Sequence, residues 1–122
     1  MGTEGYPKVV KTVAVEGYDG LVLSVVVNLT GAEWAGLGAS YDDATRAEFG
    51  RLLCKAYDGR RYEYQGNVLD FSTPEAALAT LEAPELPLDL RIWVRNVPWE
   101  AVNAYLEGLR GNFKVSFVPT ST

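Results

Sequence analysis

The segment at residues 21–29 is apolar on both sides of an extended chain, and this feature constrains the fold more than any other. In a strand its odd-numbered residues, all Leu or Val, would share one face, while the other face still carries Val22 and Val26 beside Ser24 and Asn28. Strands with two apolar faces are usually central in a sheet or covered on both sides. We therefore expect other elements, or a second copy of the chain, to cover the spare face.

Turn residues and helix caps divide the rest of the chain into short elements. Gly17-Tyr18-Asp19-Gly20 predicts a hairpin of strands at 8–16 and 21–29, and Gly66-Asn67 predicts another of strands at 61–65 and 68–71. The capping-box spacing of Thr30 and Glu33 predicts a short helix. A second helix is expected to begin at 40–43 and end at Asp58-Gly59, and Ser72-Thr73-Pro74-Glu75 predicts the start of another.

The C-terminal third reads as a strand, a helix and a strand. Residues 88–95 alternate in character, Asn96-Val97-Pro98 resembles a helix start, and residues 113–117 alternate again. The resulting order, ββααββαβαβ, predicts an α+β fold with a mixed or antiparallel sheet of about five or six strands packed by three main helices. We expect residues 1–122 to form a single domain, with mobile tails at 1–7 and 119–122.

Composition is that of an ordinary globular domain, with 48% hydrophobic and 22% charged residues. No apolar run approaches the ~18 residues that span a bilayer, so we expect no membrane association. The N-terminus lacks the basic and then apolar order of a signal peptide, which predicts a cytoplasmic or virion-associated protein. Eleven basic residues oppose sixteen acidic ones, and the net charge of -5 disfavours general nucleic-acid binding.

The chain has no histidine and only one cysteine, Cys54. Histidine is the commonest proton-transfer group near neutral pH and the commonest metal ligand, and a single thiol provides no zinc or iron–sulfur site. We therefore predict no cofactor, no metal site and no catalytic residue. An all-oxygen site for magnesium or calcium stays open.

The predicted strand at 88–95 contains the first candidate binding surface. Leu88, Leu90, Ile92 and Val94 would share one face, and Asp89, Arg91, Trp93 and Arg95 the other. Trp and Arg are enriched at the energetic centres of interfaces. A helix covering the tryptophan, or a platform for stacked bases, are the alternatives. The partner-binding residues that we predict are Trp93, Arg91, Arg95, Trp34 and Trp99.

These features favour a non-enzymatic protein-binding or assembly module that associates with itself, such as a small adaptor or a virus-associated protein. One alternative is a carboxylate-dependent enzyme or ligand-binding domain. Its candidate residues are Asp42, Asp70, Glu63, Arg60 and Arg61. Another is an acidic decoy for a nucleic-acid-binding protein, which requires the acids between residues 63 and 89 to converge on one face.

Overall fold

The computed structural model describes residues 8–39 and 41–121, with side chains as far as Leu109 in the last helix. The elements, in chain order, are β1 (Val10–Ala14), β2 (Val22–Val26), α1 (Gly31–Leu37), α2 (Arg46–Ala56), β3 (Arg61–Tyr64), β4 (Asn67–Asp70), α3 (Pro74–Glu82) and α4 (Leu88–Ser121).

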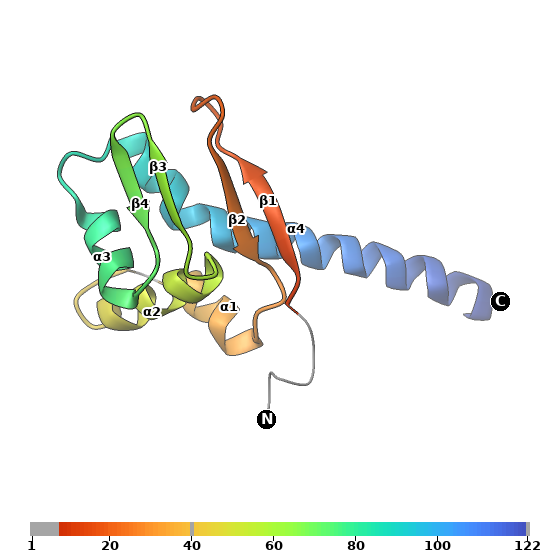
Figure 1. The fold of residues 1–122 in the computed structure, drawn as a ribbon. Helices are drawn as coiled ribbons and strands as arrows, with labels where there is room; N and C mark the ends of the chain where they lie inside the picture. Colours follow the sequence, from red (N-terminus) through yellow and green to blue (C-terminus); the bar gives the residue numbers. More distant parts are fainter. Residues whose placement is uncertain (1–7, 40, 122) are drawn as a thin grey trace.

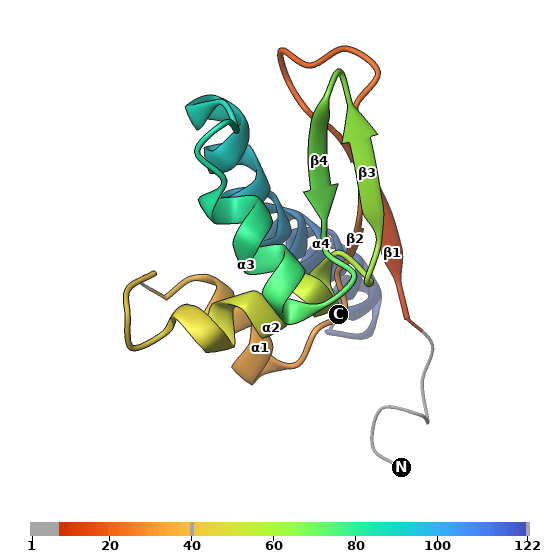
Figure 2. The same ribbon diagram turned by 60° about the vertical axis from the view of Figure 1, so that its left-hand side comes forward.

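The strands form two antiparallel hairpins, β1–β2 and β3–β4, which lie side by side in one layer (Figure 1). The helices form the second layer, and Figure 2 shows α2 and α3 on one side of the strands, with α3 next to β4. Helix α4 runs behind the hairpins and continues well past the outer edge of β1 (Figure 1). The first half of α4 therefore belongs to the body, and its second half projects from it.

This architecture shows that the predicted sheet was wrong. Within residues 8–39 and 41–121 there are four strands in two separate two-stranded sheets and four helices, in place of about five or six strands and three main helices. Both predicted strands of the C-terminal third, at 88–95 and 113–117, lie inside α4. The expected tail at 1–7 falls outside the described residues, and 119–121 form the end of α4.

Both predicted hairpins are present because their turns have the backbone geometry that hairpins need. In the first turn Gly17 and Gly20 have positive φ values of 86° and 85°. In the second, Gln65 and Gly66 have φ values of 50° and 85°, so this two-residue loop begins one position earlier than predicted. Two successive positive φ values give a loop whose twist matches that of the flanking strands.

The predicted helix starts at Thr30 and Thr73 are confirmed. The Thr30 and Glu33 side chains form a reciprocal capping box, and the Thr73 hydroxyl accepts the backbone N–H of Ala76. Helix α2, in contrast, begins at Arg46 rather than at 40–43. The Asp42 carboxylate accepts the backbone N–H groups of Ala44 and Thr45, and so forms a turn before the helix.

The core lies between the hairpin layer and the helices. Its centre is the stacked pair Tyr57 and Phe71, whose ring centroids are 4.0 Å apart and whose side chains are fully buried. The inward face of β2 also contributes, since Leu23 and Val25 are fully buried. The opposite face of β2 is covered only in part, because Val26 is buried but Val22 is 47% exposed.

Helix α4 passes through a proline that sequence patterns place at a helix start. Pro98 has no N–H to donate to the carbonyl of Val94, four residues earlier, so this buried acceptor loses its partner within the helix. The hydroxyl of Tyr57 donates to that carbonyl at 2.7 Å. A side chain from the end of α2 thus satisfies the backbone group that Pro98 leaves free, and the helix continues.

Candidate protein-binding surface

The first half of α4 carries an open, mostly apolar groove with a volume of about 410 Å³. The groove is lined by Asp89, Ile92, Trp93, Asn96, Val97 and Glu100. These positions recur at spacings of three and four, so they form one continuous stripe along the helix. Ile92 is 58% exposed, and Leu88, one turn before it, is 69% exposed. Large apolar side chains are therefore accessible to solvent along this stripe.

Asp89 lies at the N-terminal end of the groove and forms two hydrogen bonds there. Its carboxylate accepts the Tyr18 hydroxyl at 2.6 Å and the backbone N–H of Leu90 at 2.8 Å. The hydrogen bond to this carboxylate raises the pKa of Tyr18 above its ordinary value. The β1–β2 turn, which holds Tyr18, is thereby attached to the start of α4. Glu100 lies at the other end, so carboxylates bound the apolar stripe on both sides.

A second groove, of about 320 Å³, lies on the neighbouring side of α4, and Asn96 and Glu100 line both grooves. Here Trp34 and Trp99 stack with centroids 6.0 Å apart and an interplanar angle of 5°. The Trp34 indole N–H also donates to the Asn103 side chain at 2.9 Å. A Cβ at Gly38 would lie 2.4 Å from the Trp99 ring nitrogen, so glycine is needed there. The two tryptophans join α1 to α4.

Arg95 and Arg91 are engaged within the fold. The Arg95 guanidinium lies 5.6 Å from the centre of the Tyr41 ring, and the Tyr41 hydroxyl bonds to Glu82. Burial, followed by the Glu82 carboxylate, raises the pKa of Tyr41 to about 12. Arg91 donates from one terminal nitrogen to the carbonyl of Ala83 at 2.9 Å, at the end of α3, while its buried Nε has no partner.

The structure separates the predicted site residues into three groups. Trp93 is half-buried and lines the first groove; Trp99 and Arg95 line the second, with Trp34 stacked behind; Arg91 bonds to the end of α3. Residues two apart on a strand share a face, whereas on a helix they point about 200° apart. Trp93 therefore does not share a face with Arg91 and Arg95, as it would in the predicted strand.

Sequence reasoning missed most of the apolar groove. Ile92 was assigned to one face of a predicted strand, and Asn96 and Val97 were assigned to the start of a predicted helix. The signal that would have found them is the helical spacing of Asp89, Trp93, Asn96 and Glu100, which the alternation over 88–95 concealed.

The candidate residues of the carboxylate-enzyme alternative form hydrogen bonds and ion pairs with residues close to them in the sequence. Asp42 caps the turn before α2, and Asp70 accepts the hydroxyl and backbone N–H of Ser72. Glu63 pairs with Arg61 at 2.6 Å, and Arg60 lies 3.6 Å from Asp58. Cys54 is partly buried, and burial raises the pKa of its thiol. Over the described part of the chain, no three acidic or cysteine side chains gather as a metal would require.

Comparison with protein-family models, with curated proteins and with solved structures finds no match to this chain. Among the described residues, none of the helices combines the length and apolar character that crossing a bilayer requires.

Proposed function

We propose that this chain is a non-enzymatic protein-binding and assembly module, that the apolar groove on α4 binds its partner, and that the chain also associates with itself. The observation that carries the first part is the exposed pair Leu88 and Ile92 beside the half-buried Trp93. Apolar and aromatic side chains gathered on one accessible face are typical of a surface that another protein covers.

The groove also indicates the chemistry of its partner. Asp89 and Glu100 stand at its two ends, about 16 Å apart at the rise of an α-helix. A partner segment with apolar side chains for Ile92 and Trp93, and with basic residues at both ends, complements this arrangement in shape and charge. An amphipathic helix lying along α4 meets both requirements.

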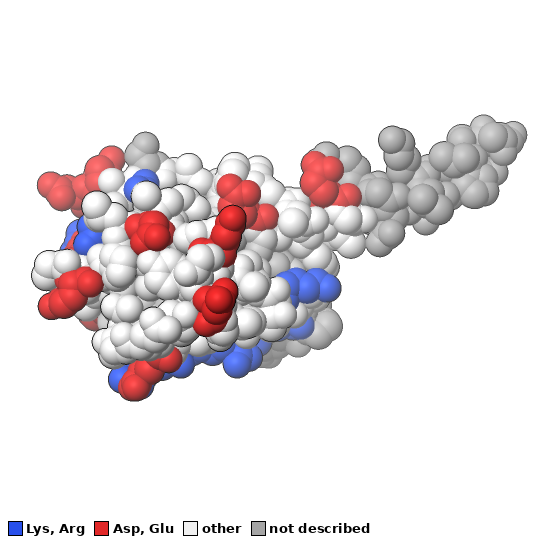
Figure 3. Space-filling model, turned by 90° about the horizontal axis from the view of Figure 1, so that it is seen from above, with Lys and Arg blue, Asp and Glu red and all other residues white. Residues whose placement is uncertain are grey.

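Two further observations support binding over the alternatives. The carboxylates of the enzyme alternative serve as caps and ion-pair partners rather than converging in a pocket. Four acids of the decoy alternative have partners within the fold: Glu63 and Asp70 flank Arg61, Glu82 pairs with Arg46, and Asp89 accepts the Tyr18 hydroxyl. On the face seen in Figure 3, acidic side chains are spread over much of the surface, with uncharged side chains between most of them.

The groove is tested by Ile92→Asp, with Val68→Asp as the matched control. Val68 is similarly exposed, at 44%, but lies on β4, away from the groove. A protein retained from cell extract by the wild type and by Val68→Asp, and lost with Ile92→Asp, is purified and its affinity is measured by calorimetry. We expect the groove variant to bind at least about tenfold more weakly. Equal affinity of the two variants for every retained protein would show that the groove is not the binding surface.

A further inference from the structure

Strand β1 has an open backbone edge. Val27 donates its N–H to Val9 and Val15 donates its N–H to Leu21, and these two pairs extend the β1–β2 register at both ends, beyond Val10 opposite Val26 and Ala14 opposite Val22. The odd-numbered residues of β1 therefore bond to β2. In an antiparallel ladder the residues between them turn their N–H and C=O groups away from the partner strand. These residues are Val10, Thr12 and Ala14, and among the described residues their outward groups have no hydrogen-bond partner.

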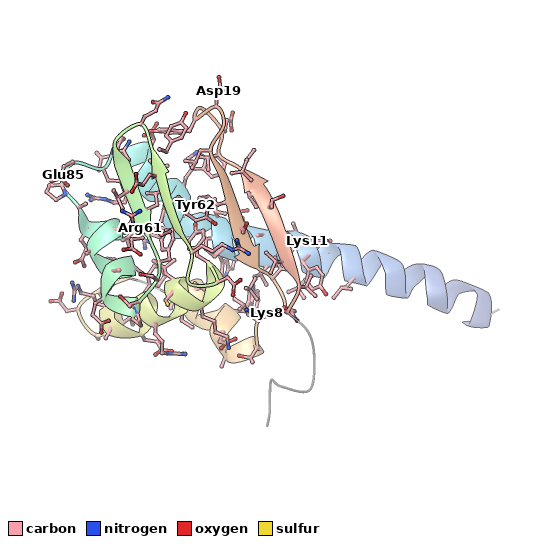
Figure 4. The ribbon with its side chains drawn as sticks, in the orientation of Figure 1. Lys8, Lys11, Asp19, Arg61, Tyr62 and Glu85 are labelled. Carbon is pink, nitrogen blue, oxygen red and sulfur yellow. The ribbon has the colours of Figure 1, made fainter. Side chains whose placement is uncertain are left out.

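On β2 and on β4, a side-chain hydroxyl bonds to one outward backbone position of the strand. The outward N–H of Ser24 on β2 donates to the Tyr62 hydroxyl at 2.8 Å, and Tyr62 lies between the two hairpins (Figure 4). On β4, the Thr80 hydroxyl accepts the N–H of Asp70 at 2.9 Å and donates to its carbonyl at 3.1 Å. β1 thus differs from β2 and β4 in offering three successive outward positions to a further strand.

We propose that β1 pairs antiparallel with β1 of a second copy of this chain, in the register that places Thr12 opposite Thr12. The inference rests on the self-association in the proposed function and not on the groove of α4. In this register Val10 of each copy faces Ala14 of the other, and each outward N–H meets an outward carbonyl. The two hairpins become one four-stranded sheet related by a two-fold axis.

Charge complementarity selects this partner and this register. Just beyond the ends of the ladder, Lys8 of one copy faces Glu16 of the other, and the two-fold axis repeats the pair at the opposite end. Lys8 pairs with Asp58 at 2.6 Å but stays largely exposed, and Glu16 is exposed with no ionic partner among the described residues. A shift by two residues in either direction loses both charge pairs and places Ala14 or Val10 opposite a residue that lies beyond the end of the strand.

Two features of the surrounding surface agree with the pairing. Val10 of β1 is 37% exposed, and in this register it gains Ala14 of the second copy as a cross-strand neighbour. Helix α4 extends beyond the β1 edge (Figure 1), so an added hairpin would lie in front of it. A lysine on an edge strand often prevents pairing, but Lys11 faces Val13 of the second copy in this register, not another lysine.

Charge reversal tests the register directly. Lys8→Glu and Glu16→Lys each place like charges opposite one another in a homodimer, so each is expected to weaken dimerisation by about tenfold. An equimolar mixture of the two variants restores both opposite-charge pairs across the interface. We expect the mixture to form a heterodimer with an affinity near that of the wild type, measured by sedimentation velocity from about 1 µM to 1 mM.

The backbone contribution is tested by Thr12→Pro, which removes an N–H that the folded chain itself does not use. Circular dichroism verifies that the variant folds, and we expect its dimer to be lost. A wild type that stays monomeric up to about 1 mM overturns the inference, as does a Thr12→Pro dimer of unchanged affinity or a mixture no tighter than its components. Ile92→Asp leaves this dimer intact, so failure of the groove and failure of the β1 pairing are distinguishable.

Discussion

The two hairpins of this protein have similar strands but opposite surroundings. The outer strand of β3–β4 lies against α3, where the Thr80 hydroxyl bonds to both backbone groups of Asp70. Among the described residues, no hydrogen-bond partner lies at the outward edge of β1, the outer strand of β1–β2, and Val10 on that strand is exposed. The difference indicates that whether a strand edge is open depends on what the fold places beside it, since both outer strands belong to similar hairpins.

The largest expected effect is the loss of a buried side chain from the β3–β4 hairpin, compared with the loss of an exposed one from the β1–β2 hairpin. Phe71 directly follows β4 and is fully buried against Tyr57. Phe71→Ala leaves a cavity there and is expected to lower the free energy of unfolding by about 3–5 kcal/mol, measured by urea denaturation. Val22→Ala, on the exposed face of β2, is the control and is expected to cost less than about 1 kcal/mol. Similar losses for both variants would contradict the placement of the core.

The edges themselves are compared by replacing threonine with valine, which has a similar shape but no hydroxyl. Thr80→Val leaves the backbone N–H and carbonyl of Asp70 without their partner, at an expected cost of about 1–3 kcal/mol. Thr12→Val on the open edge is expected to change stability by less than about 0.5 kcal/mol. Thermal unfolding of the two variants measures this difference, and a neutral Thr80→Val would show that the β4 edge is not held by α3.

A smaller effect is expected between the hairpins, where Tyr62 on β3 reaches the N–H of Ser24 on β2. Tyr62→Phe removes this bond, so the amide of Ser24 should exchange faster with solvent and stability should fall by about 0.5–1.5 kcal/mol. Tyr64→Phe is the control, because the Tyr64 hydroxyl bonds to the exposed carbonyl of Asp19 instead. Unchanged exchange at Ser24 in Tyr62→Phe would mean that the hairpins are not joined there.

The smallest effect is expected from pH, on the side of the molecule where α3 supports β4. Hydrogen bonds from Arg46 and Tyr41 lower the pKa of Glu82 from 4.5 to about 2. Because the folded pKa is depressed, the contribution of Glu82 is complete above its ordinary pKa and is lost as pH falls toward 2. Both side chains of the pair are more than a third exposed, so solvent screening keeps this contribution small. Glu82→Gln should therefore flatten the acid limb of the stability–pH curve, and an identical curve would contradict this role.

Local sequence signals were sufficient for the elements that short-range chemistry defines. Both hairpins follow from glycine-containing turns, and the starts of α1 and α3 follow from the threonines that cap them. The set of β2 residues that share the inward face was also predicted. Once the turn fixes where the strand begins, side chains alternate between its two faces. In each case the decisive interactions lie within a few residues of one another.

The largest error, at α4, arose where two periodicities overlap. Leu88, Leu90, Ile92 and Val94 alternate like a strand, yet the buried set is Leu90, Val94 and Val97, which has helical spacing. The candidate site changed with it, since Trp93 and Ile92 came together on a groove that no alternating pattern predicts. The choice between the two periods was made by contacts with other elements.

By itself, the sequence determined the two hairpins, two helix caps and the apolar face of β2, because turns and caps satisfy backbone groups through neighbouring residues. Only the tertiary structure decided that a helix continues through Pro98, since the carbonyl freed there is bonded by Tyr57, thirty-seven residues earlier. It also decided which strand edges are occupied. Hydroxyls from distant elements reach β2 and β4, and none reaches β1 within the described residues.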